Sequence, residues 1–520
     1  MTTHTSSLSA ARRERDLEQL AHGRPLDLLV VGGGITGVGV ALDAASRGLS
    51  VALVEAHDLA FGTSRWSSKL VHGGLRYLAN GHLGIAHESA VERGHLMGKV
   101  APHLVRPLPQ LLPEYGTRLK DHLKYIGVGG VADALRVAAG TSRDTLPKPR
   151  VLGRVETGRL APALRRGFDG GLLMWDGQLV DDARLVVTVA RTAAAYGARI
   201  VTRCRALQLT GAGARLRDER TGAEFDVPAR AVVNATGVWA GTLSTDVALR
   251  PSRGTHLVVR SSALGTLGAA VSVPFPGQPG RFLITVPWSD GLTLVGLTDV
   301  EAGTDIPDVP RPADSEVGDL VAAVNEVLQV PIGTEDVVGT FAGLRPLLTD
   351  ASAVAANTSD LSRKHAVVTG TDGLVTVTGG KLTTYRRMAE DAVDAAVRSG
   401  KLRGGKCRTS WLPLVGAAGA STLDAIDAPR RLVERYGTEA TRVVAAAAGD
   451  PALLRPLADG VPVIGAELVH AMRHEGALDV DDLLDRRTRV GLVPADRERV
   501  LAAARDLLAL QPSRAQLAGP

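Results

Sequence analysis

The stretch Val31-Gly32-Gly33-Gly34-Ile35-Thr36-Gly37 decides the fold, because it contains the pattern G-x-G-x-x-G. In this pattern Gly32 permits a tight turn, Gly34 lets the backbone approach a pyrophosphate, and Gly37 lets a helix pack closely on a strand. The amides at the start of that helix then face the phosphates. The stretch therefore predicts a turn that binds a dinucleotide.

The flanking sequence supports this prediction. An unbroken apolar run from Leu26 to Val31 is typical of a buried parallel strand, a helix is expected from about Thr36 to Arg47, and Ser50 to Glu55 reads as a second strand. Glu55 ends that strand about 20 residues after the glycines, where an acid binds a ribose hydroxyl. We therefore expect Gly32, Gly34, Gly37 and Glu55 to contact the cofactor.

A second motif distinguishes FAD from NAD. Ala231-Val232-Val233-Asn234-Ala235-Thr236-Gly237 is an apolar strand that ends in a turn of small residues. It resembles the second dinucleotide contact of two-domain flavoproteins, so Thr236 and Gly237 are expected at the cofactor. Together the two motifs favour FAD.

Composition limits the class of protein. A chain of 520 residues is too long for one hydrophobic core, so two or three domains are expected. Lys and Arg exceed Asp and Glu by a net charge of +5, but they form no long basic run and aromatic residues make up only 3%, which disfavours a nucleic-acid binder. The two cysteines, Cys204 and Cys407, predict neither a disulfide framework nor a metal site, and they suit a reducing cytoplasm.

The chain divides into a polar tail, an oxidoreductase region and a C-terminal domain. The tail, residues 1–25, lacks the apolar segment of a signal peptide and is expected to be disordered. Two hairpins are predicted, one from 282–288 and 292–298, and one from 366–369 and 374–378. Strands near 250–300 suggest an antiparallel sheet, and the helix-periodic segments 422–447 and 497–510 suggest a helical domain over 405–515.

Three longer stretches carry a resemblance to a known family: Gly62 to Leu78 (GTSRWSSKLVHGGLRYL), Gly343 to Leu347 (GLRPL) and Gly379 to Arg386 (GGKLTTYR). With Asp176 to Arg184 and Thr236-Gly237, they resemble the flavin-linked, respiratory glycerol-3-phosphate dehydrogenases from about residue 26 to about 500. The resemblance implies an α/β fold of the glutathione-reductase and amino-acid-oxidase type. An FAD-binding Rossmann-like domain (about 26–100, 185–245 and 340–400) carries an antiparallel-sheet substrate domain (about 101–184 and 246–339), and a helical C-terminal domain follows.

The same resemblance implies roles for individual residues. Those expected to line the flavin are Ser67, Ser68, Lys69, His72, Gly73 and Gly74, with Gly380, Lys381 and Thr383. Those expected to face the substrate are Arg76, Tyr77, His256, Arg345, Arg363 and Lys381, and of these His256, Arg345 and Lys381 are expected to be catalytic. The implied reaction oxidises sn-glycerol 3-phosphate to dihydroxyacetone phosphate, with electrons passing through non-covalent FAD to membrane quinone.

These residue types suit that chemistry. A flavin accepts hydride from a carbinol carbon, so the protein must hold that carbon near the ring and accept the hydroxyl proton. The substrate phosphate carries about two negative charges, which arginine forks and a lysine can bind. His256, Lys381 or a water molecule could accept the proton.

Membrane contact is a further expectation. Tyr115, Leu119, Leu123 and Ile126 fall on one face of a helix, with the basic residues Arg118, Lys120 and Lys124 around them. Such a helix suits an anionic lipid surface, so the protein is expected in the cytoplasm and peripherally on the inner face of the membrane, with a homodimer left open. The alternatives are a glycerol-3-phosphate oxidase that uses oxygen, an amino-acid or amine oxidase of the same fold, and an FAD-bearing protein without catalytic activity.

Overall fold

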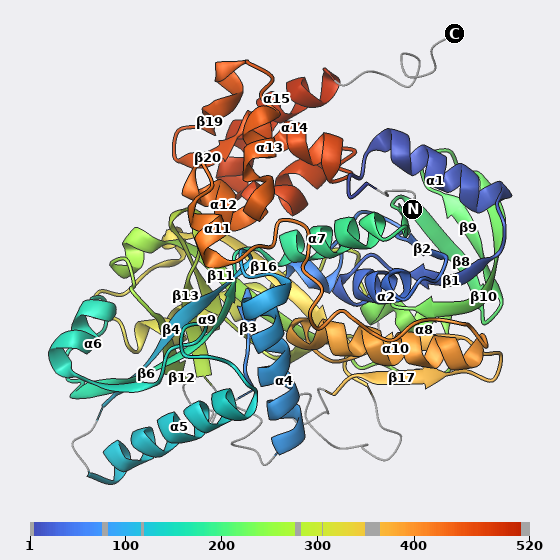
Figure 1. Ribbon diagram of the computed structural model, residues 1–520. Helices are drawn as coiled ribbons and strands as arrows, with labels where there is room; N and C mark the ends of the chain where they lie inside the picture. The colour runs from blue at the N-terminus through green and yellow to red at the C-terminus, as the bar shows by residue number, and fades with distance from the viewer. Residues whose placement is uncertain are drawn as a thin grey trace.

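A computed structural model describes residues 5–74, 82–115, 119–275, 282–303, 305–348 and 364–510. Two sheets lie side by side, with helices packed on them, and a largely helical domain covers one end of both (Figure 1). This is the α/β fold with a helical C-terminal domain that the sequence predicts.

The first sheet has eight strands and carries the glycine-rich turn. Its main order is β17-β18-β10-β1-β2-β7, with β8 and β9 joined to β10. The strands are β1 (Leu26–Val31), β2 (Val51–Val54), β7 (Arg199–Val201), β8 (Cys204–Thr210), β9 (Gly213–Asp218), β10 (Glu224–Asn234), β17 (Ala366–Thr369) and β18 (Val375–Thr378). The neighbours β18, β10, β1, β2 and β7 run parallel, and three packed helices cover them: α2 (Ile35–Ser46), α7 (Asp182–Ala195) and α10 (Tyr385–Ser399). The predicted hairpin at 366–378 is present, as the edge of this sheet.

The second sheet has ten strands and is antiparallel except where β12 pairs with β4. Its main order is β15-β11-β14-β13-β12-β4-β6-β3, with β16 on β11 and β5 on β6. The strands are β3 (Leu70–Val71), β4 (Val105–Glu114), β5 (Arg150–Gly153), β6 (Gly170–Leu179), β11 (Ser252–Arg260), β12 (Ala270–Pro274), β13 (Phe282–Pro287), β14 (Leu292–Gly296), β15 (Val300–Glu301) and β16 (Val337–Arg345). The helices α5 (Leu119–Ala138), α6 (Arg154–Leu160) and α9 (Asp314–Asn325) pack against it, and α4 (Leu83–His95) is joined to β6 by the Arg93–Asp176 pair. The predicted hairpin at 282–298 is β13 and β14.

The C-terminal domain is helical, as expected. Its elements are α11 (Ala420–Asp424), α12 (Arg430–Tyr436), α13 (Ala440–Ala445), the hairpin β19 (Pro456–Ala458) and β20 (Val461–Ile464), α14 (Gly465–His474) and α15 (Pro494–Ala509). The helix-periodic segment 422–447 is three short helices rather than one. Pro429 precedes α12, and Gly437 ends it with a positive φ of 57° that favours glycine.

The expectation of a disordered tail is wrong for residues 5–25. Residues Ala10–His22 form helix α1, whose N-cap Ser9 accepts a hydrogen bond from the amide of Arg12. Arg13 is buried, donates to the carbonyl of Thr202 at 2.7 Å and pairs with Asp218. The polar composition suggested disorder, but the charges of this segment are satisfied by residues about 190 to 205 positions away in sequence.

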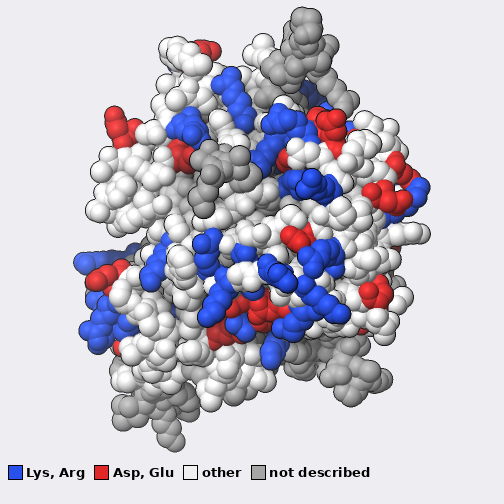
Figure 2. Space-filling view, turned by 45° about the vertical axis from the view of Figure 1, so that its right-hand side comes forward, with Lys and Arg blue, Asp and Glu red and all other residues white. Residues whose placement is uncertain are grey.

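The basic surplus is distributed over the surface. Lys and Arg side chains cross the middle of the face in Figure 2 with Asp and Glu side chains among them. On α10, for example, Arg387 pairs with Glu390 at 3.3 Å and with Asp391 at 2.8 Å. None of the described helices is both long enough and apolar enough to cross a bilayer.

Candidate active site

The glycine-rich turn joins β1 to α2 at the carboxyl ends of the parallel strands. Gly32 has a φ of +112°, and a Cβ there would lie 2.6 Å from the carbonyl oxygen of Ala235. A Cβ on Gly37 would lie 1.8 Å from the carbonyl oxygen of Gly32. The turn and the start of α2 can therefore approach each other only with glycine at both positions, which leaves a shallow cradle beside Gly34, the N-cap of α2.

Glu55 lies in this cradle. Its carboxylate accepts hydrogen bonds from the amides of Gly33 at 2.6 Å and His57 at 2.8 Å. Burial raises the pKa of Glu55, against the effect of these two amides. The predicted ribose-binding acid is thus beside the glycine turn.

The second motif meets the first. The amide of Ala235 donates to the carbonyl of Val31 at 2.8 Å, which places the end of β10 directly against the glycine turn. Thr236 donates its hydroxyl to Asn234 at 2.7 Å, and Gly237 has a positive φ of 62°. The glycine turn and the end of β10, about 200 residues apart in sequence, thus lie next to each other at the carboxyl ends of the parallel strands.

The loop 65–69 lies between the two sheets, and its serines point in different directions. Ser67 donates its amide (3.0 Å) and hydroxyl (2.7 Å) to Asp182, whereas the hydroxyl of Ser68 lies 2.8 Å from Nε2 of His256. Lys69 is wholly buried, and its Nζ lies 2.7 Å from Oδ2 of Asp182. Because that ammonium faces Asp182, any contact between Lys69 and the flavin must be made by its backbone.

Residues 72–74 are held by a buried carboxylate. Oδ1 of Asp176, on β6, accepts from the amide of Gly73 at 2.9 Å and from Nη1 of Arg93 at 2.7 Å. Burial opposes the ionisation of Asp176, but Arg93 and His72 hold its pKa below the ordinary value. Half of the His72 side chain is exposed, and Gly74 has a φ of +84°.

His256 is buried on β11 of the second sheet, between β14 and β16. Its ring stacks on Phe341 of β16 at a centroid distance of 4.7 Å, and a Cβ on Gly296 of β14 would lie 2.4 Å from its Cδ2. Burial, with the positive charges of Lys69 and Arg345, lowers the pKa of His256 to about 3. The imidazole is therefore uncharged near neutral pH, and its ring is fixed from both sides.

Arg345 ends β16 and lies across from Ser252 of β11. Its Nη1 lies 3.1 Å from the Ser252 hydroxyl and 3.1 Å from Oδ1 of Asp299. A Cβ on Gly254 would lie 2.3 Å from Nη2, so that glycine makes room for the guanidinium. Arg345 therefore has a structural pairing with Asp299 as well as a position near His256.

Lys381 follows Gly379 and Gly380, both with positive φ (76° and 68°), and precedes the short turn η7 (Leu382–Thr384). Its Nζ lies 2.9 Å from the hydroxyl of Ser89 on α4. The turn η7, which contains the buried Thr383, packs against α4 and β3, so the third stretch meets the loop that carries His72.

Three predicted substrate residues, Arg76, Tyr77 and Arg363, lie outside the described residues. The structure brings the other predicted residues to the ends of the first sheet and the adjoining part of the second. Sequence reasoning gave no role to Asp182, Asp176 or Arg93, or to Gly296 and Phe341, which fix His256. Asp181-Asp182 before an Ala/Val-rich helix is a recognisable N-cap signal, but it does not identify Lys69 as a partner.

Comparison with known proteins decides the family. Residues 27–386 match the family described as FAD dependent oxidoreductase, and residues 407–511 match the C-terminal domain of alpha-glycerophosphate oxidase. Glycerol-3-phosphate dehydrogenase 1 of Mycobacterium tuberculosis is 53% identical over 511 residues, which cover 97% of this chain and 99% of that protein. The chain belongs to the FAD-dependent glycerol-3-phosphate dehydrogenase family.

More distant relatives agree with this assignment. A mitochondrial glycerol-3-phosphate dehydrogenase of Arabidopsis thaliana is 35% identical, over 96% of this chain and 84% of that protein. The crystal structure of a glycerol-3-phosphate dehydrogenase from Bacillus halodurans complexed with FAD is 28% identical, with a TM-score of 0.75 over 98% of this chain and 95% of that chain. FAD is the cofactor of this family, and the close turn that needs glycine at Gly32 and Gly37, at the N-terminus of α2, fits its pyrophosphate.

Proposed function

We propose that this protein oxidises sn-glycerol 3-phosphate to dihydroxyacetone phosphate and passes the electrons through FAD to membrane quinone. The observation that carries the proposal is the buried His256, whose Nε2 lies 2.8 Å from the hydroxyl of Ser68 in the loop 65–69, with Arg345 close enough to affect its pKa. FAD supplies the hydride acceptor when bound. The names of the relatives, all glycerol-3-phosphate dehydrogenases, support the choice of substrate.

The residues of the chain have distinct tasks in this reaction. The imidazole of His256 accepts the hydroxyl proton at Nε2, the atom that the Ser68 hydroxyl contacts in the structure. Arg345 and Lys381 place positive charge where a phosphate can be bound. The ring of His256 is shielded from water, because it is 2% exposed and stacks on Phe341.

Anaerobic bleaching of the flavin tests the substrate. The purified yellow protein should lose its visible flavin absorbance when glycerol 3-phosphate is added, and glycerol or amino acids should have little effect. Bleaching by an amino acid or amine instead would refute the proposal. Peroxide release in air at the rate of substrate oxidation would identify oxygen, not quinone, as the electron acceptor.

Arg345→Ala tests the phosphate contact. A hydrogen bond to a charged group contributes about 1.5–3 kcal/mol, so kcat/KM for glycerol 3-phosphate should fall about tenfold to a hundredfold. The slow turnover of glycerol, which lacks the phosphate, should change much less. Arg253→Ala is the matched control, because Arg253 lies on the neighbouring strand, is similarly half-buried and pairs with Glu316 at 2.9 Å. Equal losses on both substrates would mean that Arg345 only stabilises the fold through Asp299.

Peripheral binding to the inner membrane face is the second part of the proposal, because quinone lies in the membrane. In the part of α5 whose side chains the structure describes, the exposed residues are uncharged: Ile126, Gly127, Val128, Gly130, Val131, Ala134, Val137 and Ala138. The charged side chains of Asp133 and Arg136 pair with each other at 2.7 Å instead. The helix lies at the lower edge of the molecule, far from the C-terminal domain (Figure 1).

The predicted stripe of Tyr115, Leu119, Leu123 and Ile126 is described only in part. Tyr115 and Ile126 are exposed, whereas the side chains of Leu119 and Leu123 lie outside the description. Flotation with anionic liposomes tests the surface. The protein should float at low salt, Val137→Ser should weaken flotation, and Leu454→Ser, at an exposed site of the C-terminal domain, should not. Protein that stays at the bottom refutes membrane binding.

A further inference from the structure

The loop 65–69 that carries Ser67 and Ser68, here called the flavin loop, is built around one buried carboxylate. Oδ2 of Asp182 accepts from the amide and hydroxyl of Ser67 and from Nζ of Lys69. Lys69 has a left-handed φ of 59°, and its Nζ also donates to the carbonyls of Arg65 (3.0 Å) and Ser67 (3.2 Å). The loop conformation therefore depends on a charge pair that has no contact with solvent.

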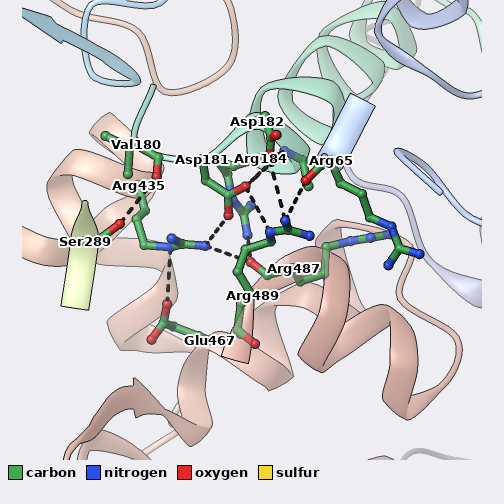
Figure 3. A network of polar contacts seen from close by, with 12 residues as sticks. Arg65, Val180, Asp181, Asp182, Arg184, Ser289, Arg435, Glu467, Arg487 and Arg489 are labelled. Carbon is green, nitrogen blue, oxygen red and sulfur yellow. Dashed lines mark hydrogen bonds and ion pairs between the residues drawn. The ribbon is translucent and has the colours of Figure 1, made fainter. Parts of the chain in front are cut away.

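The C-terminal domain reaches this pair through Arg489. Its Nη2 donates to the carbonyl of Arg65 at 2.6 Å and lies 3.9 Å from Oδ1 of Asp182 (Figure 3). Its Nη1 donates to the carbonyl of Asp485 at 2.7 Å, within its own domain, and its guanidinium lies over the Trp66 ring. The buried side chain of Arg489 thus connects the C-terminal domain to the start of the flavin loop, at Arg65 and Trp66, and to Asp182, which holds the rest of the loop.

A second arginine fixes the neighbouring carboxylate. Nη2 of Arg435 lies 2.9 Å from Oδ2 of Asp181, the N-cap of α7, and 2.9 Å from the carbonyl of Arg487. Asp181 holds the first turn of α7 by accepting from the amides of Ala183 and Arg184. Asp182 is the next residue in the chain. The position of its carboxylate therefore depends on the N-terminal end of α7, which Arg435 of the C-terminal domain holds through Asp181 (Figure 3).

We propose that Arg489 is a positioning residue for hydride transfer, through which the C-terminal domain fixes the flavin loop and holds Ser68 against His256. Arg489 touches neither His256 nor Ser68, and it acts on them through the carbonyl of Arg65 and the Asp182–Lys69 pair. The inference rests on the proposed function, because it assigns the flavin loop to the flavin and His256 to the substrate. Under this inference the C-terminal domain contributes to hydride transfer as well as to folding.

Holoenzyme variants test this task. Arg489→Met removes the charge and the hydrogen bond to the carbonyl of Arg65. Arg489→Lys keeps the charge but loses the two guanidinium nitrogens that donate to Arg65 and Asp485 together. Arg497→Met is the matched control, because Arg497 pairs with Asp481 (2.5 Å) and Asp485 (3.2 Å) of its own domain. Three quantities are measured: the rate of FAD release by flavin fluorescence, the visible circular dichroism of the bound flavin, and the limiting rate of flavin reduction with the KM for glycerol 3-phosphate.

For Arg489→Met we expect FAD release about tenfold faster or more and a limiting reduction rate about tenfold lower, the scale seen when a supporting shell is lost. The flavin dichroism should change and KM should change less than the rate, because the substrate cations remain. Arg489→Lys should fall between Arg489→Met and wild type, and Arg497→Met should match wild type.

Two outcomes overturn the inference. One is that Arg489→Met matches Arg497→Met in FAD release, dichroism and reduction rate. The other applies if Arg489→Met fails to fold. In that case, an Arg489→Lys variant that equals wild type in all three measurements refutes the role of the Arg489 guanidinium. If glycerol 3-phosphate fails to reduce the wild-type flavin, the proposed function fails, and FAD release and dichroism still decide the link between Arg489 and the flavin loop.

Discussion

Replacing Glu475 with glutamine should destabilise the protein more than any surface change. Glu475 follows α14 and is fully buried. Its Oε1 accepts a short hydrogen bond from Arg184 of α7 and lies 3.9 Å from Nη1 of Arg191 and 3.7 Å from Nε2 of His470. The carboxylate therefore joins the C-terminal domain to the helix that supports the flavin loop.

The magnitude follows from the pKa of Glu475. Burial alone would raise it, but Arg184 and its neighbours lower it from 4.5 to about 2. Such a depression corresponds to about 3 kcal/mol of stability. Because the folded-state pKa lies below the ordinary value, this contribution is complete above about pH 5 and is lost as the pH falls toward 2. About half of it should be gone near pH 3.5.

Urea unfolding followed by circular dichroism measures the effect. Glu475→Gln should lower the free energy of unfolding by about 3 kcal/mol at pH 7 and by about half as much at pH 3.5. The control is Glu434→Gln, which removes the solvent-accessible pairs of Glu434 with Arg430 and Arg106 and should cost less than about 1 kcal/mol. The reasoning is refuted if the two variants lose the same stability at pH 7, or if the loss in Glu475→Gln does not depend on pH.

Three further predictions concern His256 and the N-terminal helix. Gly296→Ala would put a Cβ 2.4 Å from His256, so the rate of flavin reduction should fall at least about tenfold with FAD retained; normal rates would mean that the ring can move. Since the pKa of His256 is about 3, the imidazole stays uncharged above about pH 5. The limiting rate of flavin reduction should therefore show no increase with pH that has a midpoint near 6.5. An increase at that pH that disappears in His256→Asn would contradict this. Arg13→Met removes the cationic partner of Asp218, which keeps only the hydroxyl of Thr221 and a nearby amide, and should cost about 3 kcal/mol in urea unfolding. An unchanged midpoint would refute this.

Local signals predicted the cofactor turn well. The expected strand at Leu26–Val31 is present with those bounds, and the expected helix at 36–47 lies at Ile35–Ser46. Glycine spacing and apolar periodicity suffice here, because each determines structure within a few residues. The position of His256 on a strand follows from the same kind of pattern.

Long-range contacts could not be predicted in this way. Nothing near Lys69 indicates that its ammonium faces Asp182, more than 110 residues on, and nothing near Arg489 indicates Arg65. The polar segment before Pro25 was misread for the same reason, since the partners that satisfy Arg13 are distant in sequence. Charged residues with remote partners look like solvent-exposed residues until the fold is known.

The N-terminal segment that the structure describes meets the C-terminal domain, which constrains the order in which the contacts can form. The amide of Leu8 donates to the carbonyl of His474 at 2.9 Å, and the amide of Gly476 donates to the carbonyl of Leu8 at 3.0 Å. Leu8 is translated long before His474 and Gly476, so these bonds cannot form until the C-terminal domain has largely been made. Until then the flavin loop lacks Arg489, so a nascent chain can begin its parallel sheet but cannot complete the active site.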